Sequence, residues 1–103
     1  MAGTVTQRVT TDAVDDFELL ELVAYVSGSN YRELVVTELD DEPRQPSQIA
    51  DVGGVARSHI SRALSELQER ELVESHGQDT RATLYTLTDP GERVRTRLST
   101  DDK

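Results

Sequence analysis

The chain of 103 residues carries twenty acidic and eleven basic residues, for a formal net charge of −9 at pH 7. It holds no cysteine, which excludes disulfides, thiolate metal sites and cysteine nucleophiles, and its length suits a single domain. No apolar run approaches the roughly 20 residues of a membrane span and the start lacks a signal-peptide pattern, so we expect a cytoplasmic protein.

The charged residues are unusual in kind and in placement. Ten of the basic residues are arginine, and Lys103 is the only lysine. Such a surface is typical of haloarchaea and other halophiles that accumulate salt, and it is a candidate for binding K⁺ or other cations; an ordinary acidic mesophilic protein is the alternative. Residues 1–42 carry ten acids and two arginines, a net of −8, whereas residues 43–98 carry eight of each. This asymmetry favours an anionic partner for the second half.

The first part of the chain predicts an arm and a helix. Residues 1–13 are polar and without periodicity, as in a loose N-terminal arm; a folded domain is expected over 14–98, and a short tail over 99–103. The first helix is predicted over about 14–27. Its apolar side chains point in nearly every direction around the axis, so a single small domain is not expected to cover them all. One side should therefore pack against a partner.

A second helix is predicted over 31–40. Asn30 is its expected N-cap, and Leu34, Val35 and Leu39 are expected to point inward.

Two further helices follow, separated by a glycine turn. Ser47 is the expected N-cap of a short helix over 48–52, and Gly53 and Gly54 are expected to supply the positive φ of a tight turn. A longer helix is predicted over about 57–70. Its buried stripe is formed by Ile60, Ala63, Leu64 and Leu67. Two short helices joined in this way are typical of a helix-turn-helix.

The outer face of the 57–70 helix is polar, with Ser58, Arg62, Ser65 and Glu69, flanked by His59 and Ser61. Its small side chains would let the helix enter a DNA major groove about 12 Å wide, where Arg62 can bind guanine O6 and N7 as a fork. Serines on this face can bind base edges or phosphate, and amides near Ser47 and Arg57 can cradle phosphate. The serines are Ser58, Ser61 and Ser65.

After this helix the hydrophobic period changes to about two. Residues 72–76 and 82–87 are predicted to form a hairpin, with Arg81 near its tip, where it can meet the DNA backbone or minor groove. Thr88 is the expected N-cap of a last helix over 89–98. The fold class is therefore mainly α with a small β-hairpin wing (α+β), a winged helix-turn-helix.

The stretch "PSQIADVGGVARSHISRALSELQERELVES", followed by "DTRATLYTLTDPG", resembles the winged helix-turn-helix transcriptional regulators of the MarR and ArsR type. The resemblance covers roughly residues 15–98. It implies a homodimer that binds a pseudo-palindromic double-stranded DNA operator. From the residues themselves, no cofactor or metal is expected. The DNA contacts that the resemblance implies, with those derived above, are Ser47, Gln48, Arg57, Ser58, His59, Ser61, Arg62, Ser65 and Arg81. The dimer interface is predicted from the outer helices at Phe17, Leu19, Leu22, Val23, Val26, Val94 and Leu98.

Three positions depart from the pattern of this family. Gly53 stands in place of a leucine, which removes an expected core contact. Ala56 replaces the usual Ser or Thr cap of the recognition helix, at a cost of about 1 kcal/mol. Glu71 replaces a glycine before the wing, so an ordinary backbone conformation is expected there.

Other interpretations remain open from the sequence. Arg62 could simply pair with Glu66 one turn later. His59 and His76 are expected at the surface rather than on a metal, and Tyr25 and Tyr31 in the core. Nothing in the sequence indicates an enzyme. The alternatives to a DNA-reading regulator are a winged-helix module that binds another protein, and a regulator that senses an effector.

Overall fold

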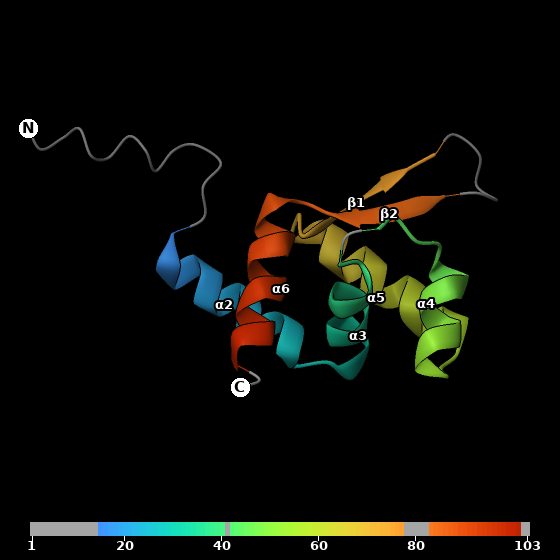
Figure 1. Ribbon diagram of the computed structural model, residues 1–103, viewed down its shortest axis with the longest axis horizontal. Helices are drawn as coiled ribbons and strands as arrows, with labels where there is room; N and C mark the ends of the chain where they lie inside the picture. The colour runs from blue at the N-terminus through green and yellow to red at the C-terminus, as the bar shows by residue number, and fades with distance from the viewer. Residues whose placement is uncertain (1–14, 41, 78–82, 102–103) are drawn as a thin grey trace, which may run out of the picture.

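The computed structural model describes residues 15–40, 42–77 and 83–101. Over these residues the chain is mainly helical with one antiparallel hairpin, which confirms the predicted secondary-structure class (Figure 1). The elements are α2 (Asp16–Ser27), α3 (Asn30–Glu38), α4 (Pro46–Gly53), α5 (Arg57–Glu69), β1 (Val73–His76), β2 (Leu84–Leu87) and α6 (Asp89–Asp101). The last helix continues three residues beyond its predicted end. The predicted N-terminal arm and Arg81 lie outside the described residues.

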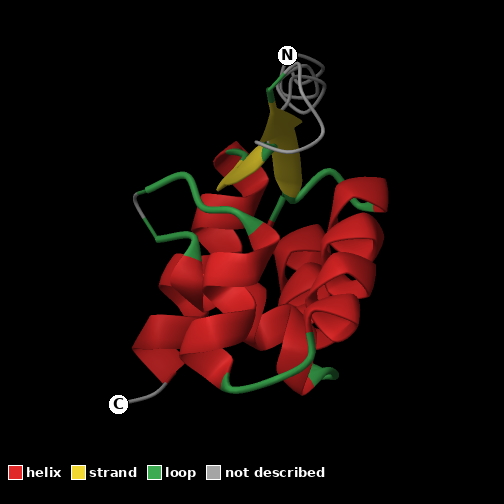
Figure 2. Ribbon diagram, turned by 90° about the vertical axis from the view of Figure 1, so that its right-hand side faces the viewer, coloured by secondary structure: helices red, strands yellow, loops and turns green. Residues whose placement is uncertain are grey.

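The core lies between the helices, and the hairpin projects from one side of them (Figure 2). Helix α3 contacts α2, α4, α5 and α6, so it is the centre of the packing. The predicted buried stripe of α5 is confirmed, because all four of its residues are buried. In α3, Val35, Val36 and Leu39 are buried, whereas Leu34 is only half-buried. The inward face of α3 is therefore turned slightly from the one predicted.

Helix α2 is not fully covered by its own chain, as expected, but the face that stays exposed is not the predicted one. Leu19, Leu22 and Val26 are all buried within the chain, where α2 packs on α3 and α6. The large side chains left outside are Phe17 and Leu20, which are 71% and 49% exposed. The unpaired apolar surface of α2 is thus smaller than predicted and lies on a different face.

Two of the predicted helix caps are wrong, because a neighbouring polar residue takes the position. Ser29 rather than Asn30 caps α3, and its Oγ accepts a hydrogen bond from the Arg32 amide at 3.2 Å. Helix α4 begins at Pro46, whose fixed φ suits the first helical position, so Gln45 rather than Ser47 is the N-cap.

Gly53 and Gly54 play different roles in the turn after α4. Gly54 alone has a positive φ, of 65°, whereas Gly53 is the last helical residue. The core contact expected to be lost at Gly53 is supplied from elsewhere, because a Cβ placed there would collide with Cδ2 of Leu34. The leucine of α3 therefore occupies the space that a side chain at position 53 would need.

The base of the wing is fastened to the start of α6. The Thr88 hydroxyl donates to the carbonyl of Glu71 at 2.7 Å and accepts from the Gly91 amide at 3.1 Å, which confirms Thr88 as the cap. The Thr88 amide donates to the carbonyl of Leu72 at 3.0 Å. A Cβ at Gly91 would collide with that same carbonyl oxygen, so only glycine allows this close approach.

Glu71 was expected to have an ordinary backbone conformation, and this expectation is wrong. Its φ is +60°, in the left-handed region that costs an L-residue about 1–2 kcal/mol. The short connection between α5 and β1 requires this turn whatever residue occupies it, so Glu71 keeps the geometry that a glycine would adopt more easily.

Replacing Glu71 by glycine is therefore expected to raise the free energy of unfolding by about 1 kcal/mol, since it removes this backbone cost. The measurement is urea denaturation in molar KCl. Glu71→Gln serves as the control for the lost charge, because it keeps a side chain in the left-handed conformation. A Glu71→Gly protein no more stable than Glu71→Gln would contradict the prediction.

Candidate nucleic-acid interface

The exposed face of α5 gathers most of the predicted DNA contacts. Arg62 lies near its middle, with a side chain that is 79% exposed. The other α5 residues predicted to reach DNA are also exposed: Arg57, Ser58, His59, Ser61 and Ser65. Ala56, the N-cap of α5, contributes no side-chain hydrogen bond, so no side chain at that position satisfies the first amides of the helix. With the exposed Glu69, these residues form the polar, solvent-facing side of α5.

The two predicted contacts in α4 lie in its first turn. Ser47 is half-buried and Gln48 is exposed. The Gln48 side-chain oxygen accepts a hydrogen bond from the Gln45 amide at 2.7 Å, so it helps to hold the start of α4. Ile49 and Ala50 are buried, and α4 packs against α5, which keeps the two helices in a fixed relation.

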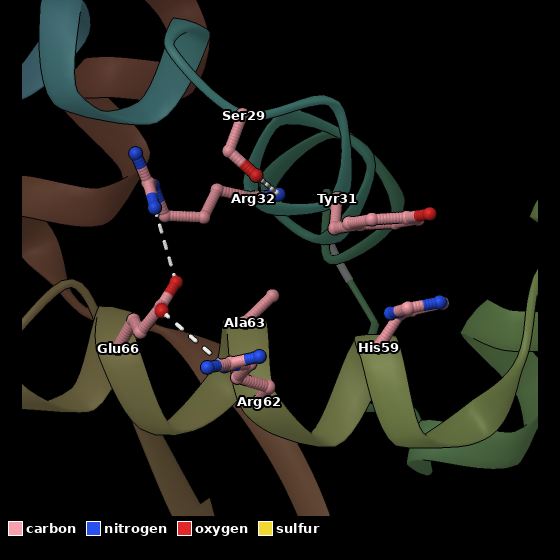
Figure 3. A pocket seen from close by; sticks show the side chains of 7 residues that line it. All are labelled: Ser29, Tyr31, Arg32, His59, Arg62, Ala63 and Glu66. Carbon is pink, nitrogen blue, oxygen red and sulfur yellow. Dashed lines mark hydrogen bonds and ion pairs between the residues drawn. The ribbon is translucent and has the colours of Figure 1, made fainter.

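The ion pair between Arg62 and Glu66 exists but is long. Arg62 Nε lies 3.9 Å from Glu66 Oε2, and an exposed pair of this kind contributes little to stability. Glu66 Oε1 lies much closer, at 3.0 Å, to Arg32 Nη1 of helix α3 (Figure 3). The carboxylate therefore has its main partner in Arg32, and Arg62 is left with a weak one.

Arg32 is held in place by α2 as well. Its Nε and Nη2 both donate to the carbonyl of Tyr25, at 2.9 and 2.7 Å. The ring of Tyr25 contacts two guanidinium groups, with Cζ of Arg32 at 3.9 Å and Cζ of Arg70 at 4.0 Å from its centroid. Such cation–π contacts join α2, α3 and the end of α5. Tyr25 was predicted to fill the core, but it is half-buried at this junction.

A hollow of about 290 Å³ separates the start of α3 from α5. On one side the rings of Tyr31 and His59 stack, with centroids 4.5 Å apart and planes within 8° of parallel. Arg62 and Glu66 lie on the other side (Figure 3). The residues lining it are Ser29, Tyr31, Arg32, His59, Arg62, Ala63 and Glu66. Sequence reasoning missed Tyr31 and Arg32 as parts of this surface, because neither has a local pattern that predicts its neighbours.

His76, in β1, has a partner within the wing. Its Nε2 lies 2.8 Å from Oγ1 of Thr86 on β2. In the part of the chain that the structure describes, no three His, Cys, Asp or Glu side chains are grouped as a metal ion would need. Within the same residues, no helix has the length and apolar character needed to cross a membrane.

Comparison with known proteins assigns the chain to a family. Residues 20–100 match the family described as HVO_A0261 N-terminal domain. No curated protein matches the chain.

Several solved structures share the fold. A zinc-responsive MarR family member, Lactococcus lactis ZitR, is 26% identical, with a TM-score of 0.62 over 70% of this chain and 51% of that one. The transcriptional regulator YodB from B. subtilis is 22% identical, with a TM-score of 0.68 over 81% of this chain and 84% of that one. The MarR family transcription regulator SP03579 is 20% identical, with a TM-score of 0.69 over 98% and 68%. The chain spans about half the length of ZitR. The resemblance to MarR-type winged helices is confirmed.

Proposed function

The chain belongs to the HVO_A0261 N-terminal domain family, and from this premise we propose that it is a transcription regulator that binds a specific double-stranded DNA sequence as a homodimer in high salt. The observation that carries the proposal is the exposed outer face of α5, which presents Arg62 among small polar side chains, with the acidic Glu69 two turns further on. A groove-reading helix needs such a face, since short side chains let it approach the base edges and an arginine can bind guanine O6 and N7 as a fork. The likeness to MarR-family structures supports the same reading.

Arg62 is assigned to base recognition, and its surroundings support the assignment. The side chain extends from the middle of the outer face, and its pair with Glu66 is long enough to be exchanged for a contact with guanine. Glu66 would not be left unpaired by that exchange, because Arg32 holds it at 3.0 Å. Ser58 and Ser65 lie on the same face and are assigned to neighbouring bases or phosphates.

The dimer is proposed to form through α2, with a revised set of residues. Leu19, Leu22, Val26 and Val94 are buried in the core of their own chain and have almost no surface to offer. Phe17 and Leu20 are exposed one turn apart on α2, and the half-buried Val23 and Leu98 pack at the edge of the core. Two copies related by a two-fold axis would cover this stripe and present two α5 helices to a pseudo-palindromic operator.

Replacing Arg62 by alanine is expected to weaken operator binding by about 1 to 3 kcal/mol, which is roughly 5- to 150-fold. Base preference should also relax at one position of each half-site, because the guanidinium fork reads one base pair. The measurement is a gel shift in molar KCl against duplex fragments, starting with DNA upstream of the chain's own coding sequence. Systematic base substitutions in the bound fragment then give the preference.

Two variants serve as comparisons in this experiment. Arg93→Ala removes the same charge from α6, away from the proposed reading face, and should change affinity less than twofold. Arg81→Ala, in the loop that the sequence predicts between the two wing strands, should weaken binding to all duplexes alike. If Arg62→Ala left DNA affinity and base preference intact, the role of Arg62 would be limited to its ion pair with Glu66. A wild-type chain that binds no duplex would instead favour a protein-binding winged helix, with Val52, 59% exposed on α4, as an apolar contact.

A further inference from the structure

The edge of α5 that faces α3 has its own geometry. At about 100° per residue, His59 lies roughly 90° around the helix from the centre of the outer face. Glu66, seven residues later, follows on the same edge, and both line the hollow shared with α3. When a helix enters a groove, side chains at its edge meet the sugar-phosphate walls rather than the bases. This edge is therefore placed for backbone contact.

The His59 ring is held in one orientation by Tyr31. The two rings are parallel and stacked, and Tyr31 is itself fixed in the first turn of α3 (Figure 3). His59 is exposed, and no side chain in the described part of the chain donates to or accepts from its ring nitrogens. An exposed imidazole with a fixed plane and free nitrogens is prepared to donate a hydrogen bond to an anion.

If the Glu66 carboxylate were unpaired, its negative charge would repel a phosphate at this edge. Arg32 compensates it from within the fold, since its Nη1 lies 3.0 Å from Oε1 and its side chain is only 17% exposed. The other guanidinium nitrogens of Arg32 are bound to the carbonyl of Tyr25. Arg32 therefore neutralises the carboxylate without leaving its place, and Arg62 adds a second positive group across the hollow.

We propose that this edge, formed by His59 stacked on Tyr31 beside the compensated Glu66, binds a phosphate of the DNA backbone next to the groove that α5 enters. The inference rests on the proposed function. In it, this edge contributes to DNA affinity but not to base preference. His59 makes the contact, and Tyr31 is a positioning residue that acts through it. The contact fixes how deeply and at which angle α5 lies in the groove.

The test compares binding to an operator fragment and to an unrelated duplex at one KCl concentration. His59→Ala should lower affinity for both by about tenfold, because a hydrogen bond to a charged group is lost in each case, and their ratio should stay unchanged. Arg62→Ala, in contrast, should reduce the ratio. His59→Ala binding within twofold of wild type, while wild type binds the operator, would overturn the inference and leave the proposed function standing.

The role of Tyr31 is tested through His59. Tyr31→Ala should cost about as much affinity as His59→Ala, Tyr31→Phe should keep wild-type affinity because its ring still stacks, and the double variant His59→Ala/Tyr31→Ala should bind no more weakly than His59→Ala. Circular dichroism checks that each variant is folded. An equal further loss on adding Tyr31→Ala to His59→Ala would overturn the positioning role. A wild-type chain that binds neither duplex would overturn the proposed function, and this inference with it.

Discussion

Replacing Phe17 and Leu20 together by glutamate is expected to halve the mass of the protein in solution. The two side chains are the large apolar groups that α2 exposes, and burying them against a second copy would remove that surface from water. Carboxylates at these positions would have to be desolvated in the interface next to those of the partner, which prevents association. Neither residue contributes to the core, so the fold of each chain should persist.

The measurement is light scattering in molar KCl, where wild type should have the mass of two chains and the double variant that of one. Val52→Glu is the control, because it places a glutamate on another exposed apolar residue, in α4, the helix at the opposite end of the molecule from α2 (Figure 1). It should leave the mass at two chains. A wild-type protein that is monomeric in molar salt would show that this stripe has no second copy as its partner.

The sequence predicted the elements of this fold closely where periodicity decides. The stripe from Ile60 to Leu67 repeats at helical spacing, and α5 begins at the predicted Arg57 and buries that stripe. The change to alternating hydrophobicity likewise predicted the hairpin. Periodicity could not decide the caps, because Ser29 and Asn30 are neighbours of equal capping ability. The choice between them depends on where the chain enters α3.

The surface around α5 was less predictable, because it depends on residues distant in sequence. Tyr31 and His59 meet only when α3 packs on α5, and Arg32 reaches Glu66 across the same interface. The apolar residues on all sides of α2 correctly predicted a helix, but they did not predict which of its faces stays exposed. That depends on how much of α2 is covered by α6, which composition does not indicate. Glu71 shows a third limit, because a tight connection can impose a positive φ on a residue that rarely adopts one.

Operator binding is expected to stay constant or to strengthen as KCl rises from about 0.2 M into the molar range. Ordinary DNA-binding proteins behave in the opposite way, because their affinity comes from releasing counterions from DNA. This chain has a net charge of −9, and its first 42 residues alone have −8, so at low salt it should repel DNA. At 1 M salt the screening length falls to about 3 Å, which removes most of this long-range repulsion.

Contacts made at close range should survive this screening. Arg57, Arg62 and Arg81 belong to residues 43–98, which have no net charge, so they can act by shape and hydrogen bonding without a broad positive field. Screening should also weaken the exposed Arg62–Glu66 pair, at 3.9 Å, more than the partly buried Arg32–Glu66 pair, at 3.0 Å. Rising salt would then release Arg62 for DNA while Glu66 stays compensated.

The test is a titration of one operator fragment across this range, with circular dichroism at each concentration to separate binding from folding. A variant carrying Glu18→Gln and Glu21→Gln, both exposed on α2, is the matched control. Because it repels DNA less, it should bind more tightly than wild type at about 0.2 M KCl and converge with it in molar salt. A steep loss of wild-type affinity with an intact fold would mean that counterion release outweighs the repulsion, and the acidic half of the chain would then serve hydration rather than DNA binding.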